Sequence, residues 1–210
     1  TAAVRSYTGF WGTRPRAVLD STGANIFLES GFLDGPSMEA ASGVFATYKY
    51  GTAALNLVSS AAFAGGTANY SVDLARDAAD NVYVLGKSSG PGTATFVVVK
   101  YSPSLAMLAS AALGNSSWEG YGAVFVDTTT GNVYVTAPGN DYTTYQLSSG
   151  LSVLNSNGLF AGYGIGVVDS SHVYVAGENN GLIVTRELNL SYTTAGGGQL
   201  QTFTASGYFG

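Results

Sequence analysis

Short hydrophobic runs alternate with polar turns along the whole chain, and no stretch keeps a helical period. Four segments share one pattern, in which an apolar run ends in aspartate, a polar turn follows, and a β-branched and aromatic run comes next. They are residues 18–28, 74–84, 124–135 and 167–175. Turn residues between two strand-favouring runs predict a β-hairpin in each segment.

A third and a fourth strand are predicted after each hairpin. The third strands are expected at 44–50, 96–101, 143–147 and 182–188, and the fourth at 55–63, 105–113, 151–160 and 192–203. Four short antiparallel strands that recur about every 50 residues are typical of a β-propeller blade. The chain is therefore predicted to be all-β, a single propeller domain over 1–210 with about four four-stranded blades.

The four repeats are expected at about 13–66, 67–119, 120–162 and 163–210, and residues 1–12 resemble an additional terminal strand. Such a strand closes a ring, pairs with a neighbouring subunit, or frays at the terminus. A longer propeller and a ring made from two chains are alternatives that these residues leave open.

Two segments also carry a family resemblance. Residues 113–135, which end in Gly131-Asn-Val-Tyr-Val135, and residues 163–177, with His172-Val-Tyr-Val175, resemble the bacterial and archaeal surface-protein β-propeller repeat, an NHL-like repeat. The second repeat keeps Asn81-Val-Tyr-Val84, and the first repeat is the most diverged. The resemblance covers most of the chain and implies a propeller fold in an extracellular or cell-surface protein. It implies no particular activity, because unrelated functions share this fold.

The amino-acid composition excludes several classes of function. Of 210 residues only 10% are charged, and Lys plus Arg number 8 against 13 Asp plus Glu, for a net charge of −5. Nucleic-acid binding needs a positive surface, so no nucleic-acid partner is expected. There is no cysteine, one histidine, and no apolar run of about 18 residues, so thiol chemistry and a membrane span are not expected. No catalytic set, cofactor or metal site is predicted, and the chain is expected not to be an enzyme.

The repeated aspartates are the first candidate site. Asp20, Asp77, Asp127 and Asp169 form either a carboxylate ring that binds Ca²⁺ or, as we favour, a set of turn residues that accept hydrogen bonds from turn amides. His172 occupies the position that asparagine holds in the other hairpins, so it too is predicted to be a turn residue.

Aromatic residues near the connections between blades are the second candidate site. They form either a platform for sugar stacking or subunit contact, or, as the favoured alternative, packing between blades. They are Trp11, Tyr70, Trp118, Tyr121, Tyr163 and Tyr208. Three sequons offer glycosylation at Asn69, Asn115 and Asn189.

Together these features favour a non-enzymatic extracellular structural or interaction module. The expected partners are copies of itself in a surface layer or filament, because low charge reduces repulsion between like subunits. A carbohydrate-binding lectin that uses the aromatic residues is the alternative, and a lyase or hydrolase in the central channel is a third hypothesis.

Overall fold

A computed structural model describes residues 16–30, 44–66, 68–90, 93–115, 122–137, 143–158, 162–169, 172–179, 182–188 and 203–204. The regular elements in these ranges are sixteen β-strands, with no helix among them. The prediction of an all-β chain is confirmed for this part of the molecule. The expected strand at 1–12 and most of the one at 192–203 lie outside the described residues.

The strands form four antiparallel sheets of four, each with its strands in chain order. The first sheet contains β1 (Arg16–Leu19), β2 (Asn25–Ser30), β3 (Phe45–Gly51) and β4 (Leu57–Phe63). The second contains β5 (Ala68–Arg76), β6 (Val82–Gly90), β7 (Thr93–Tyr101) and β8 (Met107–Asn115). The third contains β9 (Ala123–Val126), β10 (Val133–Ala137), β11 (Thr143–Leu147) and β12 (Val153–Asn157). The fourth contains β13 (Gly164–Asp169), β14 (His172–Asn179), β15 (Leu182–Leu188) and β16 (Phe203–Thr204).

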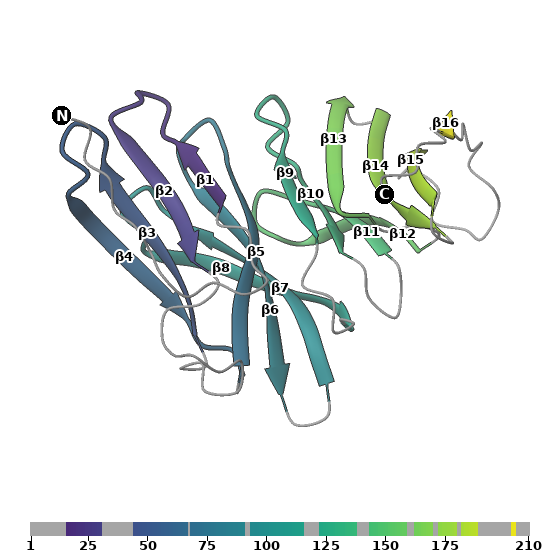
Figure 1. Ribbon diagram of the computed structural model, residues 1–210, viewed down its shortest axis with the longest axis horizontal. Coiled ribbons are helices and arrows are strands. Elements are labelled where there is room, and N and C mark those ends of the chain that lie inside the picture. The colour runs from purple at the N-terminus through teal and green to yellow at the C-terminus, as the bar shows by residue number, and fades with distance from the viewer. Residues whose placement is uncertain are drawn as a thin grey trace.

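The four sheets lie side by side in chain order and fan out from the first sheet to the fourth (Figure 1). Their first strands contact one another in succession, β1 against β5, β5 against β9, and β9 against β13. Strands β4, β8 and β12 are the outer strands of their sheets. Each sheet falls within one of the four repeats expected from the sequence.

Alternation along the strands explains why the sheets stack. In β6, Val82 and Val84 join the apolar cluster shared with the first sheet, whereas Tyr83 and Leu85 join the cluster shared with the third. Successive side chains of a strand point to opposite faces, so an unbroken apolar run buries both faces. Each inner sheet is therefore held between two neighbours.

Glycine allows close approach at two positions. A Cβ on Gly86 of the second sheet would lie 2.5 Å from Cε1 of Phe45 in the first sheet. A Cβ on Gly162, just before β13, would clash with the carbonyl oxygen of Ala176 on the neighbouring strand β14. Gly164 and Gly166 are not crowded in this way, since a Cβ at either position would meet nothing within 4 Å.

The repeated aspartates are turn residues, as predicted. Oδ1 of Asp77 accepts hydrogen bonds from the amides of Ala79 and Asn81, each at 2.9 Å, and its Oδ2 accepts one from Nδ2 of Asn81 at 2.8 Å. In the first hairpin the equivalent bond from the Asn25 side chain, at 2.6 Å, is the main cause that lowers the pKa of Asp20 to about 2. These carboxylates thus replace the partners that turn amides would otherwise find in water.

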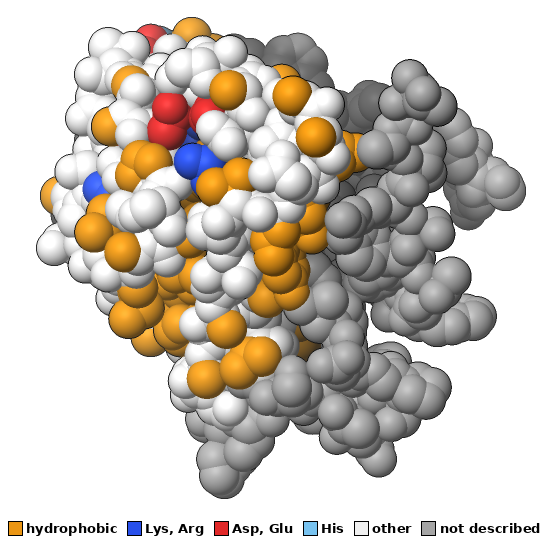
Figure 2. All heavy atoms as spheres, turned by 90° about the vertical axis from the view of Figure 1, so that its left-hand side faces the viewer, with side chains coloured by type: hydrophobic (Ala, Val, Ile, Leu, Met, Phe, Trp, Pro, Cys, Tyr) orange, Lys and Arg blue, Asp and Glu red, His pale blue; other side chains and the backbone are white. Residues whose placement is uncertain are grey.

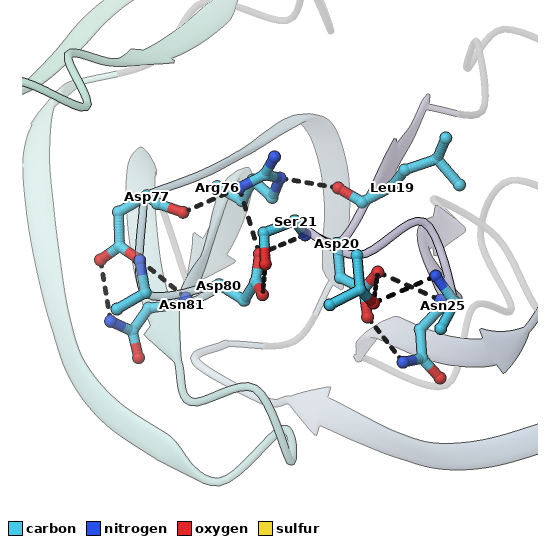
Figure 3. Close-up of polar contacts among 11 residues, drawn as sticks. Leu19, Asp20, Ser21, Asn25, Arg76, Asp77, Asp80 and Asn81 are labelled. Atoms are coloured by element: carbon cyan, nitrogen blue, oxygen red, sulfur yellow. Dashed lines mark hydrogen bonds and ion pairs between the residues drawn. The ribbon is translucent and has the colours of Figure 1, made fainter.

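The first two hairpin turns are also tied to each other (Figure 3). Asp80 accepts hydrogen bonds from the amide and hydroxyl of Ser21 at 2.8 and 2.7 Å. Arg76 donates to the carbonyl of Leu19 at 2.7 Å and forms an ion pair with Asp80 at 3.1 Å. These contacts fix the turn of the first sheet against that of the second.

The turn between the third and fourth strands places a leucine in the left-handed backbone region. The φ angles are 49° at Leu55, 67° at Leu105 and 68° at Leu151. A residue with a Cβ pays about 1–2 kcal/mol for this conformation. Leu105 and Leu151 are buried against the preceding sheet, and this burial offsets the strain.

Replacing Asp77 by alanine removes the acceptor of three hydrogen bonds inside one turn. The free energy of unfolding is expected to fall by about 1–2 kcal/mol, because two turn amides lose their partner. Urea denaturation of Asp77→Ala beside the exposed-site control Ala78→Ser measures this. Equal stability of the two variants would contradict the structural role of the aspartate.

Candidate interaction surface

Tyr70 lies on β5 and packs against the apolar cluster between the second and third sheets. Its ring centroid is 5.6 Å from Nζ of Lys87, and burial raises the pKa of Tyr70 to about 12. A ring in this position contributes to sheet packing. Of the two interpretations of the aromatic set, Tyr70 follows the packing one.

Tyr163 differs from Tyr70, since it is 39% exposed immediately before β13, and its amide donates to the carbonyl of Ala176 at 2.8 Å. One tyrosine is thus packed and the other exposed, so these two do not form a shared platform. The other predicted aromatic residues lie outside the described residues: Trp11, Trp118, Tyr121 and Tyr208.

The three sequons have different surroundings. Asn69 is 1% exposed and its side-chain nitrogen donates to the carbonyl of Gly66 at 3.1 Å, so the folded chain does not present it for glycosylation. Asn115 is exposed at the end of β8. Asn189 lies outside the described residues.

His172 is held by its own turn, as predicted. Its amide donates to Oδ1 of Asp169 at 3.0 Å, and its Nδ1 lies 2.9 Å from both carboxylate oxygens. The hydrogen bond with Asp169 is the main cause that raises the pKa of His172. Across the described ranges, no three acidic or histidine side chains gather closely enough to bind a metal ion.

A buried carboxyl group lies between the first and second sheets. Glu29 on β2 is 1% exposed and accepts a hydrogen bond from the hydroxyl of Ser71 on β5. Its Oε1 has no hydrogen-bond partner within the described structure, and burial raises the pKa of Glu29 to about 7. Arg16 and Asp73, which form an ion pair at 3.6 Å, also act on this carboxyl group: Asp73 raises its pKa and Arg16 lowers it. The contact links two sheets. Burial favours the protonated carboxyl group, whereas the hydrogen bond that Ser71 donates favours the carboxylate, and burial is the larger effect.

The outer strands carry the most regular exposed feature. Among the described residues, nine large hydrophobic side chains are exposed, and six of them form three adjacent pairs with exposed fractions of 47–61%. These outer-rim pairs are Leu57 with Val58 on β4, Met107 with Leu108 on β8, and Val153 with Leu154 on β12. The same apolar pair therefore recurs on three successive sheets.

Each pair coincides with a β-bulge. The register between third and fourth strands shifts at Lys49/Tyr50, Lys100/Tyr101 and Gln146/Leu147. The register of Cα partners skips Val58, Leu108 and Leu154. A bulge bends an edge strand, so each apolar pair projects from the outer rim at an equivalent place.

The outer strands contain no charge. Their sequences are LVSSAAF, MLASAALGN and VLNSN, without any Lys, Arg, Asp or Glu. Figure 2 shows the molecule from the side of the first sheet, where small hydrophobic groups stand among neutral atoms and acidic and basic side chains are few. Exposed edge strands usually carry charges, lysine above all, that oppose pairing with other chains. These three strands lack that protection.

Composition and hairpin spacing did not reveal the outer-rim pairs. The sequence signal is a leucine two residues before each pair, at Leu55, Leu105 and Leu151. Only the structure shows that these leucines turn the chain and that the residues after them are exposed.

Comparison with known proteins gives the fold and no activity. No family model and no curated protein matches the chain. It is similar to the crystal structure of a protein of unknown function from Bacteroides caccae, with a TM-score of 0.57 and 12% sequence identity. The match covers 90% of this chain but 60% of that one. The described residues contain no helix that is long and apolar enough to cross a membrane.

Glu29→Gln tests the buried carboxyl group. The folded state holds the Glu29 proton more tightly than the unfolded state does, so its contribution to stability is present below about pH 4.5 and is lost as the pH rises through 7. Wild type is expected to lose roughly 3 kcal/mol relative to Glu29→Gln over that range. Urea denaturation at pH 4 and pH 8 measures the difference. A gap between the variants that does not widen with pH would show that Glu29 titrates normally.

Proposed function

We propose that this chain is a non-enzymatic structural module that acts outside the cell and associates with copies of itself through its outer strands. Its four sheets are the blades of a β-propeller, and the assembly is a surface layer or filament. The observation that carries this proposal is the set of outer-rim pairs on three uncharged outer strands.

Edge strands offer backbone groups for pairing, and exposed apolar residues favour removal from water. The three outer-rim pairs are spaced identically on every copy. The pairs of one copy can therefore face those of a second copy. This self-complementarity is the property that a symmetric contact between identical subunits requires.

Other partners fit this rim less well. An anionic lipid surface or a nucleic acid attracts basic residues, whereas the outer strands have none and the chain has a net charge of −5. A sugar platform needs exposed aromatic rings, and Tyr70 is packed between sheets. A second copy is therefore the partner we propose.

One lysine in each outer strand tests the proposal. Ser60, Ser110 and Ser156 are exposed at equivalent positions, three residues after the first member of each pair. Sedimentation velocity of wild type is expected to show association that rises with concentration. The triple variant Ser60→Lys, Ser110→Lys, Ser156→Lys is expected to dissociate at least tenfold more readily, since like charges would face one another at the contact.

The matched control carries the same added charge elsewhere. Ala24, Ala78 and Thr128 are exposed in the first turn of each of the three sheets, and their replacement by lysine should leave association unchanged. A wild type that remains monomeric at all concentrations would refute self-association. Equal weakening in both variants would show that net charge, and not the outer rim, controls it.

A further inference from the structure

One equivalent position on each third strand carries a different polar side chain from sheet to sheet. Lys49, Lys100, Gln146 and Glu187 hold this position, because each lies directly opposite the aromatic residue of the second strand. Those aromatic partners are Phe27, Tyr83, Tyr134 and Tyr174. The chemical character of the position changes along the chain from cation through neutral amide to anion.

In the first two sheets the lysine at this position donates a hydrogen bond to a backbone carbonyl of the following sheet. Nζ of Lys49 donates to the carbonyl of Pro103 at 3.0 Å, and Nζ of Lys100 donates to that of Ser149 at 2.9 Å. The hydroxyl of Tyr83 adds a bond to the same Ser149 oxygen at 3.2 Å. Both acceptors lie two residues before a left-handed leucine. The lysine thus recognises the turn between the third and fourth strands of the next sheet.

The third sheet uses its residue differently. Gln146 donates to the hydroxyl of Tyr134 at 3.1 Å and accepts from Nδ2 of Asn155 at 2.6 Å, so it binds within its own sheet.

In the fourth sheet, Glu187 places a hydrogen-bond acceptor where the first two sheets have a lysine donor. A carboxylate only accepts hydrogen bonds, so it cannot capture a carbonyl. It hydrogen-bonds Tyr174 and lies 3.8 Å from Nε2 of His172, which is half exposed.

Among the described residues, the rest of this face carries small side chains and no neighbouring sheet packs on it. Gly166 stands opposite Tyr174, where the first three sheets have Val18, Ala75 and Phe125, all packed against a neighbouring sheet. A Cβ at Gly164 or Gly166 would meet nothing within 4 Å, and Val168 is 76% exposed. In the part of the fourth sheet that the structure describes, this face therefore presents glycine beside an aromatic ring and a carboxylate, where the other sheets have packed apolar side chains.

We propose that this open face of the fourth sheet binds a further β-sheet whose turn between third and fourth strands carries a lysine or arginine side chain. The same carboxylate rejects the first sheet of a second copy. The equivalent turn of the first sheet, residues 51–56, has the sequence GTAALN and offers carbonyls without any cation. Opposite Glu187 it would place acceptor against acceptor, which costs affinity. The inference goes beyond the proposed function, because it concerns a different face of the molecule.

Charge changes at two positions test this specificity. Ala53 is exposed in that turn, two residues before Leu55. Ala53→Lys supplies the missing cation, so a second copy should now dock head to tail, with its dissociation constant lowered about tenfold. Adding Glu187→Gln to Ala53→Lys should remove the gain, and adding Glu187→Lys should remove it more completely. Ala78→Lys is the control, because it adds the same charge in a turn of the second sheet.

Sedimentation velocity at low and high salt gives the readout, and circular dichroism confirms that each variant is folded. If wild type associates through its outer strands, all variants are made in the Ser60→Lys, Ser110→Lys, Ser156→Lys background; if it is monomeric, wild type itself serves. A salt-sensitive gain in Ala53→Lys that depends on Glu187 supports the proposal. No gain in folded Ala53→Lys, or a gain that survives Glu187→Lys, overturns it, and neither result bears on association through the outer strands.

Discussion

The structure depends on one constraint, that a four-stranded sheet with two apolar faces must bury both of them. The second sheet satisfies it completely, because Val82 and Val84 pack toward the first sheet while Tyr83 and Leu85 pack toward the third. Burial of apolar surface is not directional, so it does not fix the position of one sheet on the next. Hydrogen bonds at the turns fix that position. Stacking therefore supplies the stability, and Asp80, Lys49 and Lys100 supply the register.

Stacking in one direction leaves three kinds of surface with different chemistry. The buried faces are apolar, the outer edges are neutral with recurring apolar pairs, and the open face of the fourth sheet is acidic around Glu187. The two contacts that we propose, of copy with copy and of the fourth sheet with a further sheet, thus involve separate surfaces. In the proposed assembly, growth through one surface would leave the selectivity of the other unchanged.

Much of the fold could be predicted from the sequence, because hairpins are local. The hairpins, the turn aspartates and the strands at 143–147 and 182–188 follow from residues close together in the chain. The surface could not be predicted in the same way. Packing of Tyr70 was the favoured of two alternatives, and Asn69 was one of three possible glycan sites. Whether Tyr70 is covered depends on the third sheet, more than 45 residues later, and Asn69 is 1% exposed on the opposite face of β5. In the sequence, the outer-rim pairs do not differ from other strand residues. Their exposure follows from the bulges, which only the structure shows.

The left-handed leucines make the order of the sheets difficult to change. Leu105 belongs to the second sheet by sequence but is buried in the cluster shared with the first, and Leu151 of the third sheet is buried against the second. Each strained turn is therefore stabilised by the sheet that precedes it. Removing a sheet from the start of the array would leave the next leucine strained and exposed, whereas loss of the last sheet would leave both of these leucines covered. The array is therefore expected to tolerate loss of its last sheet better than loss of its first.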